Sequence, residues 1–280
     1  MKKTLFLAAA SLMIVKASFA QVDKSVRFGI RATPAVNWMT PDNDKKVKKG
    51  GAVMKAGMGL VLEFKLSDVA TFQTGADYTG AGFKAEYTGT DTAGYLYKDD
   101  AIVEAEIKND SINGITAFMT GGGASHRLAT RKYNLGYLNI PLTFKLKTKD
   151  IGGITYFGQI GGNIMFRMKA RANDEVYVTK YTSGSYVTAT STTEIEKIDI
   201  AKTMNLMTAA ANVGGGLEYN ISGSTSLYGS IHYQHHFMFA TKQDSGYLIR
   251  SKTENNKSIQ SEFPNGVRLR QFVLAVGILF

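Results

Sequence analysis

The sequence predicts an all-β protein, an eight-stranded antiparallel up-and-down transmembrane β-barrel with long extracellular loops. Three observations predict this fold. The chain ends in an alternating run in which Phe272, Leu274, Val276, Ile278 and Phe280 share one parity, with mostly small or polar residues between them. The N-terminus has the pattern of an export signal, and no later apolar run approaches the ~20 residues that a membrane helix needs. Alternation returns in seven further segments, so any membrane crossing is expected to be made by strands.

The first twenty residues have the pattern of a cleaved signal peptide. Two lysines form a basic start, residues 4–15 are mostly apolar, and small residues stand at the two positions that a signal peptidase recognises. Cleavage is expected after Ala20, so that the mature barrel domain spans 21–280. The new first residue, Gln21, is not Cys, which argues against a lipoprotein. Retention as a membrane anchor is the less favoured alternative, because the segment is short and contains Lys16.

Composition and charge narrow the possible functions. The chain has 29 Gly, 14 Tyr and 15 Phe against 4 Pro, which suits strands and turns. It has no Cys, so disulfides and thiolate metal sites are excluded, and no cofactor is expected. The signal carries three lysines and no acids, so its removal lowers the net charge from +10 to +7. Because an exported barrel meets anionic lipid headgroups before nucleic acid, outer-membrane lipid is the expected partner and nucleic acid is not.

Eight segments have the length and the alternation of barrel strands. A strand that crosses an outer membrane needs about 9–11 residues, with lipid-facing and lumen-facing positions alternating. In the second segment, for example, Met58, Leu60 and Leu62 alternate with small or charged residues. The expected strands are residues 26–38, 52–66, 69–82, 133–147, 154–170, 207–220, 225–239 and 267–280.

The connections between these strands fall into two classes. Short ones are expected at 67–68, 148–153 and 221–224. Long ones alternate with them, at 39–51, 83–132, 171–206 and 240–266. Short periplasmic turns that alternate with long outer loops are typical of an outer-membrane barrel with both termini in the periplasm.

Aromatic residues on the apolar parity give an independent check, because ring side chains prefer the two membrane interfaces. Those expected near the periplasm are Phe28, Phe64, Phe72, Phe144, Tyr156, Tyr219 and Phe280. Those expected near the outer surface are Trp38, Tyr78, Phe166, Phe237 and Phe239. The alternative is a soluble lipocalin-like barrel with an apolar interior, but such a protein would rarely cover its exterior with two aromatic belts.

Two irregularities are expected in the fourth strand. Pro141 removes a backbone donor from the ladder, which predicts a bulge or weakened pairing. Leu135 and Tyr137 have the opposite parity to Leu138, which predicts a bulge near Gly136 where the apolar face switches.

The same strand carries a family resemblance. Its sequence, Tyr-Leu-Asn-Ile-Pro-Leu over 137–142, resembles the Tyr-Leu-x-Ile-Pro-Leu strand of small outer-membrane β-barrels of the Bacteroidota, the PorT-like group. The glycine-rich strand at 158–162, the one at 214–216 and the terminal Phe280 are also similar to that group. The resemblance covers most of 21–280 apart from the long loops, and it implies an architecture more than an activity. PorT itself is implicated in assembling a secretion system, so envelope or secretion proteins are possible partners.

The resemblance also implies that the terminal strand, ending in Phe280, is a signal for the barrel-insertion machinery.

Charged residues of lumen parity predict a plug near the periplasmic end of the barrel. Glu63, Lys145 and Glu218 are expected to point inward, with Lys65 one step lower on the same face. Charges in a narrow interior must pair or be solvated. A looser, wetter layer is expected above them, and its members are Asp77, Asn163, Arg167 and His232, with Arg167 nearest the outer mouth of the barrel. The alternative is that lumen water screens these charges and the pairing adds roughly 0–1 kcal/mol.

Two histidines of the seventh strand are candidates for metal binding or catalysis. His232 and His236 share the lumen face but stand roughly 13 Å apart at 3.3 Å per residue, which is too far for one metal ion without loop ligands. Ser230 and His232 have a spacing that would allow a serine to meet a base. Parity turns both inward, away from lipid, so hydrogen bonding inside the lumen is the preferred interpretation and no metal or catalytic residue is expected.

The long loops offer little chemistry. Residues 175–191 alternate around Ser183 and Gly184, which predicts a hairpin above the membrane. The run Thr-Gly-Gly-Gly-Ala at 120–124 lacks the context of a phosphate loop, so a flexible surface loop is expected.

The expected function is that of a non-enzymatic barrel that acts through binding or assembly contacts. A narrow passive channel for ions or small polar solutes is the alternative, although an eight-stranded barrel is just wide enough to be filled by its own side chains. An outer-membrane lipid-modifying enzyme is the third possibility.

Overall fold

The computed structural model describes residues 25–42, 47–87, 92–109, 111–254 and 257–280. The expected signal peptide and its cleavage site at Ala20 and Gln21 lie outside the described residues. Among the described residues, no helix is long and apolar enough to cross a membrane.

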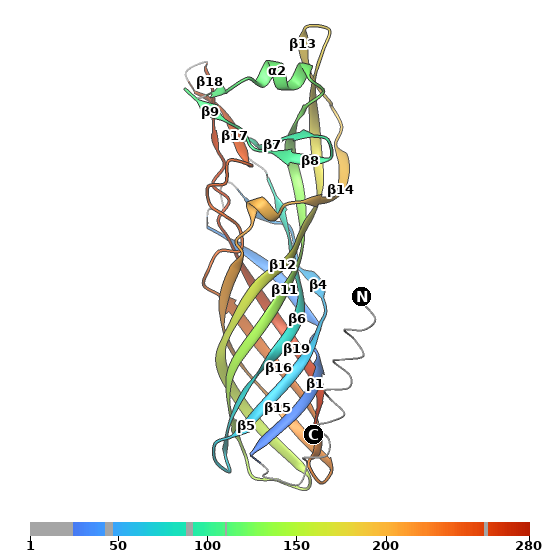
Figure 1. The fold of residues 1–280 in the computed structure, drawn as a ribbon, viewed down its shortest axis with the longest axis vertical. Helices are drawn as coiled ribbons and strands as arrows, with labels where there is room; N and C mark the ends of the chain where they lie inside the picture. The colour runs from blue at the N-terminus through green and yellow to red at the C-terminus, as the bar shows by residue number, and fades with distance from the viewer. Residues whose placement is uncertain (1–24, 43–46, 88–91, 110, 255–256) are drawn as a thin grey trace, which may run out of the picture.

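Eight antiparallel strands close into a barrel, as the sequence predicted (Figure 1). Each strand pairs with the next along the chain, and the last strand pairs with the first through Gly29↔Leu279 to Ala32↔Val276, which leaves no open edge. The ring consists of β1 (Val26–Ala32) continued by β2 (Ala35–Pro41), β4 (Val53–Lys55) continued by β5 (Gly57–Lys65), β6 (Ala70–Glu86), β11 (Ala124–Lys147), β12 (Ile154–Thr182), β15 (Met207–Ser222), β16 (Thr225–His236) and β19 (Val267–Leu279).

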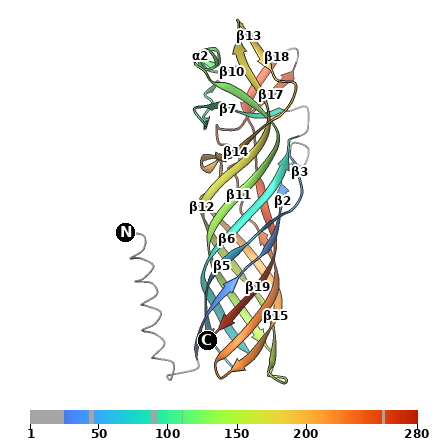
Figure 2. The same cartoon turned by 90° about the vertical axis from the view of Figure 1, so that its right-hand side faces the viewer.

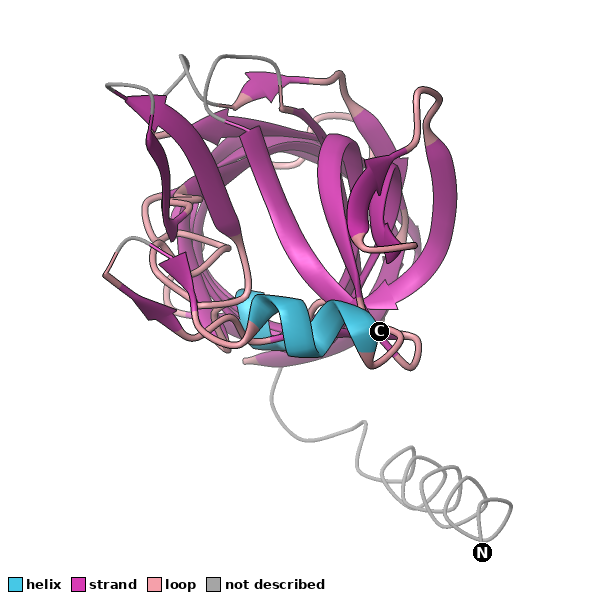
Figure 3. Ribbon diagram, turned by 90° about the horizontal axis from the view of Figure 1, so that it is seen from above, coloured by secondary structure: helices cyan, strands magenta, loops and turns pink. Residues whose placement is uncertain are grey.

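The two ends of the barrel differ as expected. Short turns join β5 to β6, β11 to β12 and β15 to β16, and the C-terminus lies at the same end (Figures 1 and 2). At the other end the chain builds a tall structure (Figures 1 and 2), which is seen from above in Figure 3. That structure contains β3 (Lys48–Lys49), β7 (Thr92–Lys98), β8 (Ala101–Val103), β9 (Ile107–Lys108), β10 (Ser111–Ile112), α2 (Ile115–Thr120), β13 (Ser185–Thr188), β14 (Thr193–Asp199), η2 (Ala201–Thr203), β17 (Ile249–Glu254) and β18 (Lys257–Glu262).

The long connections expected at this end are present, and much of their length is paired strand. β11 and β12 have 24 and 29 residues, far more than the about 9–11 that cross a membrane, and they remain paired up to Ser125↔Thr179. The Gly run at 121–123 does not form an isolated flexible loop. It closes α2, where the Gly123 N–H donates to the Phe118 carbonyl at 3.0 Å, and β11 begins at Ala124 directly after it.

Apolar side chains cover the outside of the membrane-spanning part, and polar ones fill its inside. Both aromatic groups predicted from parity lie mainly outside, for example Phe28 (54% exposed) at the short-turn end and Tyr78 (50%) at the other. The interior positions of the same strands are occupied by residues such as Gln73, Asn139 and Thr143, all buried. An apolar exterior around a polar interior is the reverse of a soluble lipocalin-like barrel, so that alternative is wrong.

Three strand details depart from the expected pattern. The first strand breaks at Thr33 and Pro34, where Pro34 has no N–H to donate, and resumes as β2. The seventh strand ends at His236, so Phe239 lies beyond it, where the Arg268 guanidinium stacks on its ring at 3.9 Å. Pro141 keeps its place against β12 but has no ladder partner in β6, which confirms the weakened pairing expected there.

The bulge expected near Gly136 is present, but it belongs to β12. The register between β11 and β12 shifts between Gly136↔Lys169 and Tyr137↔Arg167, which leaves Met168 as the extra residue. Below it Met165 points inward, and above it Ala170 does, so β12 switches its inner parity. The predicted face switch in β11 is wrong: Leu135 and Tyr137 both point inward, because the interior is apolar at this height.

Candidate functional site

The interior of the barrel is a candidate site because it holds most of the buried charge of the described residues. At the short-turn end, Lys145 donates to Glu63 at 2.5 Å and lies 3.6 Å from Glu218. Both carboxylates and the ammonium group are buried. The structure thus brings together the three residues that the sequence placed in a charged plug.

Two further cations complete this cluster. Lys147 lies 3.2 Å from Glu63 and 2.8 Å from Glu218, and Arg27 donates to both carboxylates, at 2.8 Å to Glu218. Three cations therefore share two carboxylates. Arg27 has the lumen parity of its strand, between the outward Val26 and Phe28, so parity could have found it; Lys147 was missed because it stands at the last position of β11.

Lys65 does not belong to the cluster, contrary to the prediction. Its ammonium group is half-exposed and pairs with Asp68 in the turn at 2.6 Å. Lys65 is the final residue of β5, and there the chain turns out of the barrel, so strand parity no longer fixes the direction of its side chain.

A second layer is built on an arginine that the sequence analysis missed. The Arg31 guanidinium donates two hydrogen bonds to the Asp77 carboxylate, from Nε at 2.9 Å and from Nη2 at 2.5 Å. Asn139 donates to the same carboxylate at 3.0 Å. Such a bidentate pair is geometrically fixed. The prediction that Asp77 is loosely held is therefore wrong, because the Arg31 guanidinium fixes its carboxylate.

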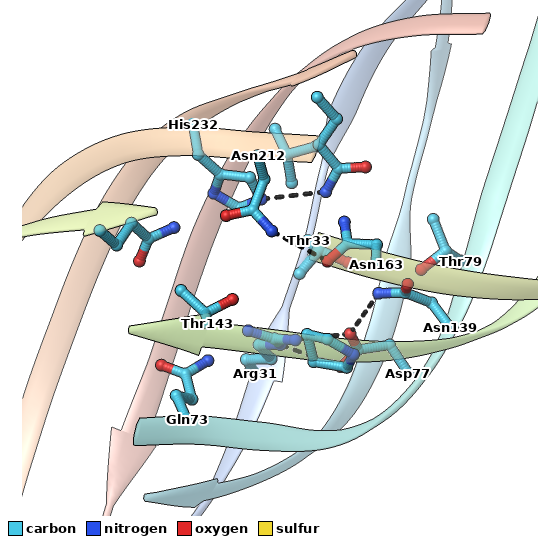
Figure 4. A pocket seen from close by; sticks show the side chains of 14 residues that line it. Arg31, Thr33, Gln73, Asp77, Thr79, Asn139, Thr143, Asn163, Asn212 and His232 are labelled. Atoms are coloured by element: carbon cyan, nitrogen blue, oxygen red, sulfur yellow. Dashed lines mark hydrogen bonds and ion pairs between the residues drawn. The ribbon is translucent and has the colours of Figure 1, made fainter. Parts of the chain in front are cut away.

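This pair is part of the lining of a polar cavity (Figure 4). Asn212 donates to Asn163 at 3.1 Å, and His232 lies 3.2 Å from the amide of Gln234. The remaining lining is also uncharged apart from the Arg31–Asp77 pair, with Gln73 and Thr143 among its residues. This polar cavity corresponds to the layer predicted above the charge cluster, and Asp77, Asn163 and His232 are the predicted members that line it.

Arg167 lies apart from that layer. Its Nε donates to the backbone carbonyl of Asn205 at 3.2 Å, near the connection that precedes β15. This is the outer end of the lumen, as predicted, but Arg167 makes no ion pair with another of the described residues. His236 lies nearby in the upper lumen, where its Nδ1 is 3.3 Å from the Thr208 hydroxyl.

The residues considered for catalysis or metal binding point inward. Ser230 and His232 are both buried in the lumen, the orientation that strand parity predicted. Within the described part of the chain, no three His, Asp or Glu side chains are grouped so that they could hold a metal ion.

The interior changes character above the cavity and becomes an apolar core. Side chains from β6, β11, β12 and the outer segments pack together, with the rings of Phe83 and Tyr133 stacked at 4.2 Å. The members that are essentially unexposed include Met39, Ala81, Tyr95, Tyr137, Met165, Ala172, Met204, Leu248, Phe263, Val267 and Leu269. This outer core fills the barrel above the membrane.

One ion pair is buried inside the outer core. Arg131 donates to Asp174 at 2.7 and 2.6 Å, and both side chains are fully buried. The Tyr95 hydroxyl donates to the same carboxylate at 2.9 Å, and the guanidinium lies over the Tyr95 and Tyr133 rings. Burial raises the pKa of Tyr95, so this hydroxyl stays protonated and keeps donating. The pair ties β11 to β12 and β7 outside the membrane.

The outermost part is the hairpin that the sequence predicted within 175–191. It is formed by the end of β12 and by β13, and the turn at Ser183 and Gly184 takes positive φ values of 52° and 82° (Figure 1). Its Tyr186 is 50% exposed and shares a hydrogen bond of 2.9 Å with Thr116 of α2.

Comparisons with known proteins found one family and a set of distantly similar solved structures. The model of one family, described as outer membrane protein beta-barrel domain, matches residues 19–263. No curated protein matches the chain. Similar solved structures include Neisserial surface protein A (12% identity, TM-score 0.36, 90% of this chain and 95% of that one) and OprG from Pseudomonas aeruginosa (11%, 0.37, 91% and 95%). The outer membrane protease OmpT from Escherichia coli is also similar (9%, 0.32, 92% and 97%).

At these identities and TM-scores, the likenesses to solved structures bear on neither activity nor ligand. The family match covers most of the chain and agrees with the closed ring of eight strands. The chain belongs to the outer membrane protein beta-barrel domain family.

Proposed function

We propose that this protein is a non-enzymatic, non-conducting outer-membrane barrel of the PorT-like group, which acts through binding or assembly contacts of the structure that it carries outside the membrane. The observation that carries the proposal is the filling of the barrel at two levels. The charge cluster around Lys145 occupies the periplasmic end, and the outer core occupies the other. A solute would have to break both to pass.

The ordered structure outside the membrane supports the choice of contacts over transport. A strand that only crosses the membrane needs about 9–11 residues, whereas β12 has 29 and extends far outside the membrane. The hairpin at the top of β12 carries Tyr181 and Tyr186, whose rings meet edge to face at 5.1 Å, and Val187, which is 56% exposed. Exposed aromatic and β-branched side chains on a rigid support are suited to binding a protein surface.

The finer parts of the proposal follow the sequence. The protein is exported to the outer membrane of a Gram-negative cell with a signal peptide cleaved between Ala20 and Gln21. The barrel-insertion machinery engages the terminal strand and Phe280. Envelope or secretion proteins are the partners to be expected from the resemblance to the PorT-like group.

The two other functions have less support. A passive channel needs a continuous wet path, and the described interior offers a polar cavity between two filled layers. A lipid-modifying enzyme needs its reactive groups at the lipid surface, and Ser230 and His232 lie inside. Analysis of membrane lipids from cells with and without the protein tests the enzyme directly.

Site-specific photo-crosslinking tests the proposed contacts. A photoreactive phenylalanine analogue replaces Tyr186 in the outer hairpin, or Lys149 in the exposed turn between β11 and β12 as the matched control. Irradiation of intact cells should give a discrete crosslinked protein from position 186 and none from position 149. Crosslinks from position 149 alone, or from neither position, would argue against an outer binding surface.

A further inference from the structure

A regular lattice of outward-facing residues lies just above the apolar band on β6, β11 and β12. Its rows follow from the strand registers. The lowest row is apolar, with Tyr78, Leu138 and Phe166 side by side, and all three are exposed. The next three rows are Gly80–Gly136–Lys169, Gly82–Asn134–Arg171 and Lys84–Lys132–Asn173.

Cations gather in these three rows without carboxylates. Lys84 and Lys132 lie directly opposite each other in the ladder, an arrangement that destabilises a sheet unless an anion screens it. Lys169 and Arg171 follow on the neighbouring strand, and both are exposed. No ion pair joins any of these four side chains to a carboxylate of the described residues. On β6, β11 and β12 acids appear only in the fourth row, Glu86–Thr130–Glu175, and on the neighbouring β14 Asp199 lies opposite Arg171.

Neighbouring side chains cover the glycines of these rows. At Gly80 and Gly136 the lattice has no side chain, and a Cβ at Gly136 would lie 2.4 Å from the Tyr78 hydroxyl, which covers it from below. Lys55 from β4 lies across Gly80 and Gly82, and its ammonium group donates to Asn134 at 2.8 Å. Lys55 therefore joins the other cations in one cationic patch, defined here as Lys55, Lys84, Lys132, Lys169 and Arg171.

The lowest row of the patch stands at the height of the headgroup layer. The hydrocarbon core of a bilayer is about 30 Å thick, and the headgroup regions extend it to about 40–45 Å, which leaves roughly 5–8 Å on each side. Rows on one strand face are about 6.6 Å apart along the strand. The first cationic row therefore stands within the headgroup layer if the exposed ring of Tyr78 marks the membrane boundary.

We propose that the cationic patch binds the phosphate-bearing headgroup of an outer-leaflet lipid, with the acyl chains lying against the apolar row below. The five cations supply charge and hydrogen-bond donors for phosphate oxygens. The acyl chains contact Leu138, Phe166 and the exposed Met168 beneath the patch. This inference does not depend on the function proposed above.

Native mass spectrometry of the full-length barrel in neutral detergent tests the proposal. The probe is dioleoylphosphatidic acid, and dioleoylphosphatidylcholine and inorganic phosphate serve as comparison ligands. The test variant is Lys132→Gln/Lys169→Gln. The matched control, Lys98→Gln/Lys180→Gln, removes the same charge from β7 and from the far end of β12, well above the membrane. Heat-modifiable migration on gels verifies that each variant is folded.

The wild type should bind phosphatidic acid more tightly than either comparison ligand. The apparent Kd should rise about 30-fold in the test variant, at about fivefold per lysine, and stay within twofold in the control. If the double variant does not fold, Lys169→Gln alone should show a rise of about fivefold. Three results would overturn the proposal. Equal binding of phosphatidylcholine would favour an acidic protein as the partner of the patch, and equal binding of inorganic phosphate would remove any role of the lipid. Equal losses of affinity for phosphatidic acid in both double variants would show that binding does not depend on the patch.

Discussion

At the scale of single residues, the balance of charge at the periplasmic end determines which substitutions should be costly. Lys145 is held by Glu63 at 2.5 Å but lies 3.6 Å from Glu218, and its ammonium group also lies 4.4 Å from the centre of the Phe157 ring. Arg27 and Lys147 contact both carboxylates. Loss of one cation leaves two cations with two carboxylates, whereas loss of Glu63 leaves three cations with one.

We therefore expect Glu63→Gln to destabilise the barrel much more than Lys145→Met. Removal of one partner from a buried pair costs about 3–5 kcal/mol, and Glu63 is 1% exposed. For Lys145→Met the cost should be about 1 kcal/mol, because the remaining charges balance and methionine fills similar space. Urea unfolding of both variants in detergent, monitored by tryptophan fluorescence, measures the difference in their free energies of unfolding. Equal stability of the two variants would mean that lumen water screens the cluster.

A buried histidine makes the outer structure sensitive to acid. His126 is 3% exposed, and its ring stacks on Tyr97 at 4.7 Å. Burial lowers its pKa to about 4, against an opposing effect of the Asp174 carboxylate. The unfolded chain binds a proton near pH 6.5, so His126 contributes its full stability above about pH 6.5 and loses it as the pH falls towards 4.

We expect the outer structure to be cleaved faster by protease at pH 5 than at pH 7.5, under conditions in which the membrane-spanning part stays resistant. His126→Phe keeps an aromatic ring in place and removes the proton site, so it should reduce the ratio of the two rates. A ratio as large in His126→Phe as in the wild type would assign the acid sensitivity to other groups.

At the scale of elements, the closing seam between β1 and β19 gives the last residue a structural role. The Phe280 N–H donates to the Phe28 carbonyl at 2.7 Å, and the Phe28 N–H donates back at 3.3 Å. The Phe280 ring is 53% exposed and lies on the lipid-facing parity. The backbone of this residue therefore serves the barrel, while its ring remains free for recognition.

This division predicts that one change, the loss of the Phe280 ring, has different effects in cells and in detergent. Phe280→Ala keeps both backbone hydrogen bonds and should lower the yield of folded, heat-modifiable barrel in cells, since it removes only the ring expected to engage the insertion machinery. The same variant refolded from urea into detergent should reach wild-type yield. Unchanged yield in cells would remove the proposed role of the ring, and a poor yield in detergent would make its role structural.

The outer hairpin gives a test of orientation. Exposed loop tips are the preferred sites of proteolytic nicking, and the turn at 183–184 is the outermost tip of β12 and β13. Protease added to intact cells should cut near this turn and leave a protected fragment that contains the barrel. Cuts confined to the turns at 67–68 or 221–224 would invert the barrel.

At the scale of the whole molecule, strand parity predicted the membrane-spanning part well because lipid imposes it. Outward residues such as Phe272 and inward ones such as Gln271 meet such different surroundings that the alternation is strong. The charge cluster was found for the same reason, through Glu63, Lys145 and Glu218. Lys65 was misplaced because it stands at a strand end, where the chain leaves the barrel.

The outer structure could not be predicted in the same way. Above the membrane both faces of the sheet are free of lipid, and the apolar side chains turn inward to form a core, as Tyr133 and Leu135 do. The bulge at Met168 changes the inner parity of β12, so the alternation below it cannot be extended upward. Arg131 and Asp174 are 43 residues apart, and nothing in the local pattern indicates that they pair.

The central claim is that two filled layers, one charged and one apolar, close the barrel so that it acts through contacts and not through transport. Single-channel recording of the purified wild-type protein in planar bilayers tests it most directly. We expect no discrete conductance steps, and none in Lys145→Met, because the outer core still closes the upper end when the charge cluster is altered. Stable, reproducible conductance steps from the folded wild-type barrel would contradict the account and favour a narrow channel.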